Sequence, residues 1–134
     1  MYNKIIIASA LDQGFAQRAI QTAKILLTDN GKIIALHVVE PVNNVVQSFV
    51  SEEAKSQGHK TIQEMMSDRF GDDQHIESVI LSGHPGSIIP AHAKMVGADC
   101  IIVGSHKPGL EDFFLGSTSS RIVRHASCSV HVLR

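Results

Sequence analysis

The chain has 134 residues, of which 43% are hydrophobic and 19% charged, proportions that are ordinary for a globular protein. Its 12 basic residues nearly balance its 13 acidic ones, and no basic block stands out, so nucleic acid is a poor default partner. No apolar stretch reaches the length of a membrane span, and we expect no signal peptide. We expect a single cytoplasmic domain over residues 1–134, with Cys100 and Cys128 as reduced thiols.

The first third of the chain alternates short β-branched runs with a helical pattern. Residues 4–9 read "KIIIAS", a continuous β-branched run of the kind found in strands buried on both faces. In residues 12–31 apolar positions recur at spacings of three and four, which predicts an amphipathic helix that ends in turn residues at Gly31. A second strand is expected over residues 32–41, where Pro41 ends it.

The middle of the chain is more polar. Within residues 44–70, Ser51 followed by two glutamates predicts a helix start. One face of that helix would carry Ile62, Met65, Met66 and Phe70, with both methionines in the core. Residues 75–83 predict the third strand, and residues 84–99 a shorter helix with Pro90 near its first turn.

The end of the chain continues the alternation. Residues 100–105 predict a strand, residues 117–127 a helix and residues 129–134 a last strand. Strict alternation of strands and helices predicts an α/β fold, a doubly wound parallel sheet of five strands with helices on both faces. Ligands of such sheets bind beyond the carboxyl ends of the strands, where the strand order reverses. The loops after the first and fourth strands are therefore the places to expect a site.

The loop after the fourth strand has an unusual composition. It reads "GSHKPGLEDFFLGSTSS", from Gly104 to residue 120, with His106 and Lys107 near its start and hydroxyl residues after Gly116. Glycines let backbone approach a ligand, and the free N–H groups of a helix start attract anions. A serine-rich helix start is equally an ordinary cap, so the composition alone leaves both interpretations open.

The same stretch resembles the signature of the universal stress protein family. In that family a Gly ends the fourth strand and a Gly-Ser pair opens the last helix, as Gly104 and Gly116-Ser117 do here. The segments "MYNKIIIA", "LHVVEP" and "SGHPGSIIPAHAKMVGADCIIVGSH" also resemble family strands, so the likeness spans the chain. The "GSHKP" form is most similar to the small bacterial F and G branch. The resemblance implies strand order 3-2-1-4-5 and, in many members, bound ATP or a related adenine nucleotide.

The resemblance also implies which residues would meet the nucleotide. The backbone of Val38 would bond the adenine, Val103 and Gly104 would lie under the ribose and phosphates, and the start of the last helix would hold the phosphates. The loop after the first strand would close the adenine side. The complete set is Ala8, Ser9, Ala10, Asp12, Val38, Val103, Gly104, His106, Lys107, Gly109, Gly116, Ser117 and Thr118.

Two positions depart from the family pattern and leave alternatives open. Ala10 stands where nucleotide-binding members usually carry an Asp, and Asp12 is close enough to substitute. Lys107 replaces a Gly and would add a phosphate contact, while Gly109 would restore flexibility. One alternative is a nucleotide-free dimeric interaction module, which Ala10 favours. Another is a slow ATPase or autophosphorylating protein, with magnesium held by Asp12 or Glu111.

Other chemistry has little support in the sequence. The eight histidines form neither HxxxH nor HxH pairs, so we expect no metal site. There is no nucleophile elbow and no Walker signature, and we assign no catalytic residue. Residues 129–134 would form an edge strand with apolar side chains, which predicts a homodimer through that strand unless a helix or loop covers it.

Overall fold

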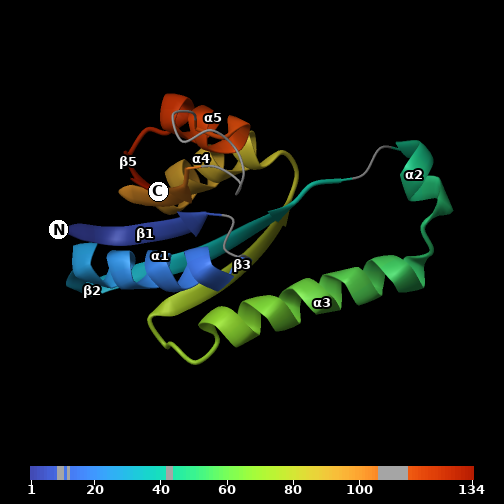
Figure 1. Ribbon diagram of the computed structural model, residues 1–134, viewed down its shortest axis with the longest axis horizontal. Coiled ribbons are helices and arrows are strands. Elements are labelled where there is room, and N and C mark those ends of the chain that lie inside the picture. The colour runs from blue at the N-terminus through green and yellow to red at the C-terminus, as the bar shows by residue number, and fades with distance from the viewer. Residues whose placement is uncertain (9–10, 12, 42–43, 106–114) are drawn as a thin grey trace.

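The computed structural model describes residues 1–8, 11, 13–41, 44–105 and 115–134, and its centre is a five-stranded parallel sheet (Figure 1). The strand order is β3-β2-β1-β4-β5, which confirms both the predicted fold class and the predicted order. The strands are β1 (Tyr2–Ala8), β2 (Leu27–Val39), β3 (Ile76–Ser82), β4 (Cys100–Gly104) and β5 (Ser129–Leu133). The helices are α1 (Gln13–Leu26), α2 (Asn44–Phe49), α3 (Glu52–Phe70), α4 (Pro85–Val96) and α5 (Ser117–His125).

The central strands are apolar on both sides because helices cover both faces of the sheet. Alternate residues of β1 face opposite layers: Ile5 and Ile7 pack with α1 and α3, while Ile6 and Ala8 pack with α4 and α5. Figure 1 shows α4 and α5 together on one side of the sheet and α1 on the other. Residues 5–8 are all buried, which is the expected pattern for such a strand and agrees with the β-branched run noted in the sequence.

The predicted boundary between the first helix and the second strand was wrong. Instead of a helix that ends at Gly31, α1 ends at Leu26 and β2 already begins at Leu27, which pairs with Tyr2. The pairing shifts register between Tyr2 and Lys4, so the turn-like residues lie in an irregular stretch of strand. Gly31 leaves room for the Leu27 side chain, since a Cβ there would lie 2.5 Å from it. The two adjacent leucines continued the helical spacing and concealed the change.

The helix predictions met three different outcomes. Ser51 is confirmed as the cap of α3, since its hydroxyl accepts the N–H of Ala54 at 3.1 Å. Pro90 lies inside α4 and not near its first turn, because the helix already begins at Pro85. The short helix α2 before Ser51 was not predicted, because the uncharged sequence around it has no clear helical period.

The segment formed by α2 and the first half of α3 stands away from the sheet (Figure 1). Three apolar side chains of α2 are largely exposed: Val45 at 69%, Val46 at 45% and Phe49 at 85%. The second half of α3 packs against the core through Met66 and Phe70, which are both buried. Met65 is only partly buried, so the core assignment holds for one methionine of the pair. Within the described residues no helix is long and apolar enough to cross a membrane.

A carboxylate fastens the start of the chain to the loop before β4. Asp99 accepts the backbone N–H groups of Asn3 at 2.9 Å and Lys4 at 3.0 Å, and its own N–H donates to the Lys4 carbonyl. The Lys4 ammonium donates to the Val96 carbonyl at 2.8 Å. Burial acts to raise the pKa of Asp99, but the donated N–H groups outweigh it and hold this pKa below its ordinary 3.8.

We predict that Asp99→Asn lowers the free energy of unfolding by about 1 kcal/mol at neutral pH, because it weakens two charge-assisted hydrogen bonds. The lowered pKa means that this stabilisation is present above the unfolded-state pKa and is lost as pH falls through the folded-state value. Urea unfolding at several pH values measures the difference. It should be constant at neutral pH and shrink below about pH 4; a difference independent of pH would contradict the assignment.

Candidate functional site

The sheet reverses its strand order between β1 and β4. From β1 the chain crosses to β2 and β3 on one side, and from β4 it crosses to β5 on the other. The carboxyl ends of β1 and β4 are neighbours, since Ile7 pairs with Ile102 and each strand ends within two residues of that pair. The two loops singled out in the sequence therefore leave from adjacent strands, which is the position expected of a ligand site in this architecture.

Three predicted residues lie in strands and offer only backbone to a ligand. Ala8, Val38 and Val103 are 2%, 5% and 2% exposed, and their side chains belong to the apolar cluster beneath α4 and α5. They come from three neighbouring strands and lie close to the carboxyl ends of β1, β2 and β4. The structure thus brings these three together, and contacts to a ligand would have to use their N–H and C=O groups.

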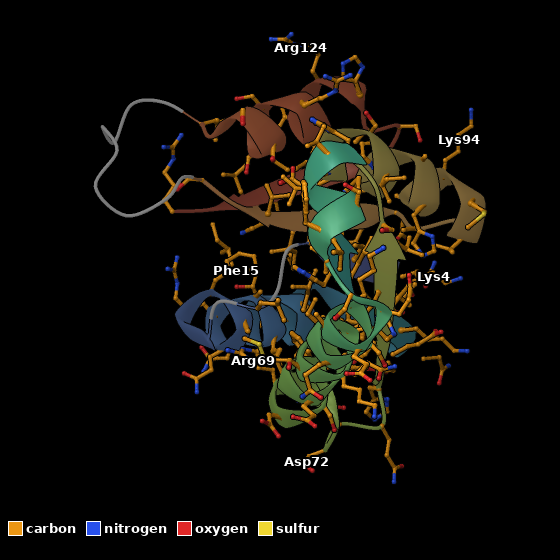
Figure 2. All side chains as sticks on the ribbon, turned by 90° about the vertical axis from the view of Figure 1, so that its right-hand side faces the viewer. Lys4, Phe15, Arg69, Asp72, Lys94 and Arg124 are labelled. Atoms are coloured by element: carbon orange, nitrogen blue, oxygen red, sulfur yellow. The ribbon has the colours of Figure 1, made fainter. Side chains whose placement is uncertain are left out.

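Gly104 ends β4 in a conformation that does not itself require glycine. Its φ is not positive, and among the described atoms a Cβ there would lie nearest the Phe15 ring, at an ordinary 3.5 Å. Phe15 lies on α1 and faces the sheet (Figure 2). The described part of the fold would therefore accept alanine at position 104, and a ligand that approaches the backbone would give a reason for glycine.

Gly83, between β3 and α4, and Gly86, in the first turn of α4, differ from Gly104, because the fold explains both of them. Gly83 has a φ of 142°, which L side chains rarely adopt. At Gly86 a Cβ would lie 2.7 Å from Cδ of Arg121, since the stem of that arginine crosses over the start of α4. These contacts give both glycines a structural role where the chain passes from β3 into α4.

The first turn of α5 is fastened to the end of β4. Gly116 is the N-cap residue and supplies no capping side chain, while its N–H donates to the Ser105 carbonyl at 2.7 Å. The hydroxyl of Ser119 donates to the carbonyl of Gly104. Ser117 is exposed and Thr118 partly buried, at the start of the helix. The structure therefore places Gly104, Gly116 and the first α5 residues together.

The N-terminus of α5 has the electrostatics of an anion site. The first N–H groups of a helix have no intrahelical acceptor, and the helix dipole adds partial positive charge there. Because the cap residue, Gly116, has no side chain, it offers no acceptor to these N–H donors. A hydroxyl such as that of Ser117 could add a further hydrogen bond to a phosphate oxygen. The chemistry available in the described part is thus the binding of an anion by backbone, hydroxyl and dipole.

The remaining predicted site residues lie outside the described residues and stay predictions. They are Ser9, Ala10, Asp12, His106, Lys107 and Gly109, together with Glu111 from the alternative metal assignment.

The titratable groups of the described core carry little charge at neutral pH. Burial lowers the pKa of His37 on β2, which keeps its imidazole neutral. Burial also raises the pKa of Cys100 to about 11 and raises that of Cys128, so both free thiols stay protonated. Within the described ranges no group of three or more histidine, cysteine or acidic side chains could hold a metal ion.

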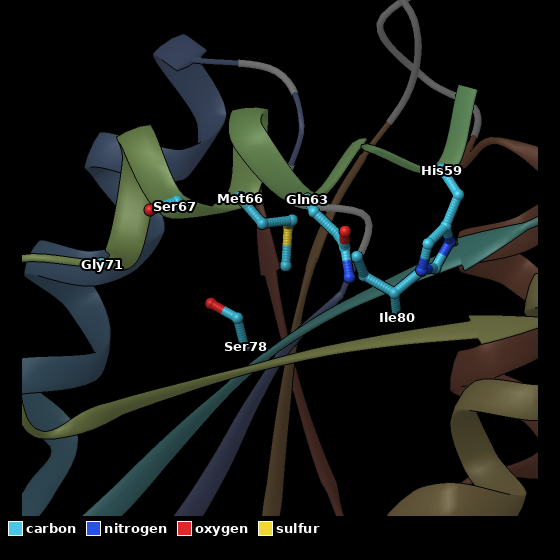
Figure 3. A pocket seen from close by; sticks show the side chains of 7 residues that line it. All are labelled: His59, Gln63, Met66, Ser67, Gly71, Ser78 and Ile80. Carbon is cyan, nitrogen blue, oxygen red and sulfur yellow. The ribbon is translucent and has the colours of Figure 1, made fainter. Parts of the chain in front are cut away.

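Two hollows open beside α3, on the other side of the molecule from α5. One, of about 440 Å³, lies between α3 and the edge strand β3, with His59, Met66 and Ile80 among its lining residues (Figure 3). The other, of about 520 Å³, lies near Lys24 and Arg69, where β3 begins. Neither is lined by a predicted site residue. Neither is lined by residues of β1 or β4, whose carboxyl ends form the switch point at which ligands of this architecture bind.

Two residues that lie at the carboxyl edge of the sheet, next to Gly104, were missed in the sequence. Phe15 belongs to the apolar pattern that predicted the first helix, and in the structure its ring borders Gly104. Ser119 was grouped with the other hydroxyl residues, but its bond leads out of the helix to β4. The signal that could have found Ser119 is the density of hydroxyls in "STSS", which exceeds what one cap needs.

Comparison with known proteins shows the family to which the chain belongs. The profile described as "Universal stress protein family" matches residues 1–134. The chain belongs to the universal stress protein family. It is 27% identical to universal stress protein G of Shigella flexneri over the full length of both chains. It is also 30% identical to universal stress protein A homolog 2 of Coxiella burnetii, over 99% of this chain and 95% of that protein.

Solved structures of the family share the fold. The structure of the hypothetical protein MJ0577 matches with a TM-score of 0.77 and 25% identity, over 99% of this chain and 96% of that one. A universal stress protein in complex with cAMP matches with a TM-score of 0.65 at 18% identity, over 99% and 97% of the two chains. One from Archaeoglobus fulgidus in complex with dAMP matches with a TM-score of 0.63 at 16% identity, over 99% and 98%.

Proposed function

We propose that this universal stress protein binds an adenine nucleotide, with ATP as the leading candidate, at the carboxyl edge of β1, β2 and β4. The observation that carries the proposal is the glycine-capped start of α5, held beside Gly104 at the switch point. Two proteins of this fold are complexed with cAMP and dAMP, which supports adenine as the base. The nucleotide would serve the protein as a bound ligand in the cellular stress response.

In this proposal each part of the nucleotide meets a different element. The adenine lies against the end of β2, where the Val38 backbone offers an N–H and a carbonyl. The ribose and first phosphate pass over Val103 and Gly104, where a Cβ is absent. The outer phosphates lie at the first N–H groups of α5, near Ser117 and Thr118. We assign no catalytic residue, and magnesium would accompany the phosphates only as a counterion.

We predict that Gly116→Asp weakens ATP binding by at least about tenfold, because its carboxylate would occupy the first-turn N–H groups and repel phosphate. The φ of −60° and ψ of 160° at Gly116 are ordinary for any residue, and Asp is a favoured cap, so the fold should be kept. Isothermal titration calorimetry measures affinity, and thermal unfolding measures stability.

Gly116→Asn is the matched control, because it caps the helix without a charge and should weaken ATP less. Gly104→Ala provides an independent variant that the described contacts tolerate but that brings a methyl group to the ligand side. No heat of binding for the unmodified protein at millimolar ATP would refute the proposed function.

We predict that Lys107→Ala weakens ATP more than AMP, because a lysine in this loop would contact the outer phosphates through its charge. Added salt should narrow the difference between the two nucleotides, since screening reduces the charge contribution. Competition titrations at low and high salt measure both ratios. Equal weakening of ATP and AMP would show that Lys107 acts through loop shape and not through charge.

The proposal includes a homodimer through β5, which is an edge strand of the sheet. Its residues Val130, Val132 and Leu133 are only partly buried. The Leu133 carbonyl accepts the Ser105 N–H at 2.9 Å, so the backbone of Leu133 is directed toward β4. Successive residues of a strand alternate in direction, and the N–H of Val132 therefore points to the open edge, where a second copy could pair antiparallel.

We predict that Val132→Pro converts a dimer into a monomer while the β4–β5 pairing is kept, because proline removes an outward N–H. Sedimentation velocity at micromolar concentration measures the mass, and thermal unfolding of the monomer checks the fold. His131→Pro is the contrasting variant, since by the same alternation it removes an N–H directed toward β4 and should destabilise the protein. A monomeric wild-type protein at high micromolar concentration would refute the dimer.

A further inference from the structure

The hydroxyl of Ser119 makes a contact that an ordinary helix cap does not make. It donates to the Gly104 carbonyl, on a strand 15 residues earlier in the chain. The next hydroxyl, on Ser120, remains local and reaches the Leu115 carbonyl at 3.4 Å, just before the helix. Serines near a helix start normally bond their own segment in this local way. The bond of Ser119 therefore does not cap α5 but connects α5 to β4.

We propose that Ser119 is a positioning residue for the phosphate end of the nucleotide site. Its hydroxyl sets the orientation of the first turn of α5 relative to the end of β4, so that the free N–H groups of that turn face the space over Gly104. This inference rests on the proposed function and adds to it the residue that aligns the two halves of the site.

The positioning follows from two bonds to consecutive carbonyls of the β4 end. The Gly116 N–H donates to the Ser105 carbonyl at 2.7 Å, and the Ser119 hydroxyl donates to the Gly104 carbonyl. A single bond at Gly116 would act as a pivot, around which the helix start could turn. A second bond three residues later removes that rotation, because two separated points fix the direction of a rigid turn.

The orientation of the turn matters because anion binding by a helix start is short-ranged. The favourable field and the free N–H groups are confined to the first turn, and each contact contributes modestly. The Ser120 N–H is already used, since it donates to the Gly116 carbonyl at 2.9 Å. The donors left for a phosphate are those of the residues just before it, and a small rotation would redirect all of them together.

The test compares ATP with adenosine in the full-length protein. Ser119→Ala should weaken ATP by about three- to tenfold, the effect of losing one or two helix-start contacts, and leave adenosine affinity unchanged. Adenosine is the matched ligand because it lacks the phosphates that α5 would hold. A variant with a merely structural defect would lose both ligands in the same proportion, so the ratio of the two affinities separates the roles.

Two further variants act as controls. Ser119→Thr keeps the hydroxyl and should restore the wild-type ratio, while Ser120→Ala removes the neighbouring local bond and should leave the ratio unchanged. If Ser119→Ala did not fold, as judged by circular dichroism, Ser119→Cys would replace it, because a thiol is a weaker donor and should give a smaller loss.

Amide hydrogen exchange without ligand tests the structural half of the inference. In Ser119→Ala the amides of residues 116–120 should exchange faster by about threefold or more, because the helix start is held by one bond fewer. Unchanged exchange, or equal loss of ATP and adenosine, would overturn the inference. A wild-type protein that bound no ATP would instead overturn the proposed function, and the exchange result would still decide whether Ser119 fixes the helix start.

Discussion

The attachment of α5 to the end of β4 is the constraint on which the candidate site depends. Two consecutive carbonyls, of Gly104 and Ser105, accept from Ser119 and Gly116, and the Ser105 N–H donates to Leu133. These bonds join the end of β4 to the last helix and the last strand at one place. The backbone donors of the proposed anion site, at the start of α5, are therefore held by the scaffold.

The burial of the sheet explains why the site must be built from backbone. Ile6, Ile101 and their neighbours are fully buried because helices cover both faces, so side chains at the ends of these strands are committed to the core. Only the N–H and C=O groups at the carboxyl edge and the loops beyond it remain for a ligand. A planar base can use such groups, and a phosphate can use a helix start. The proposed nucleotide carries both groups.

The sequence predicted what periodicity controls and missed what individual contacts control. The sequence predicted the alternation of strands and helices, the buried run of β1 and the Ser51 cap. These features follow from burial and from local hydrogen bonding. The start of β2 was not readable, because Leu27 satisfies a helical spacing yet pairs with Tyr2 across the sheet. The glycines and hydroxyls of the candidate site were singled out by composition and family resemblance, and their role stays a prediction. The partner of Ser119 depends on how β4 and α5 pack, which no local pattern encodes.

The replacement of the usual acid by Ala10 shifts the balance of the proposed site toward the phosphates. A carboxylate after the first strand would add polar contacts to the base or ribose, and alanine cannot. On β2, near the carboxyl end of that strand, His37 adds no charge, because burial lowers its pKa. The affinity would then depend on several weak contacts at α5, each worth about 1 kcal/mol or less. Such a sum is sensitive to geometry, and for that reason the rigidity of the α5 start should set how well this chain retains a nucleotide.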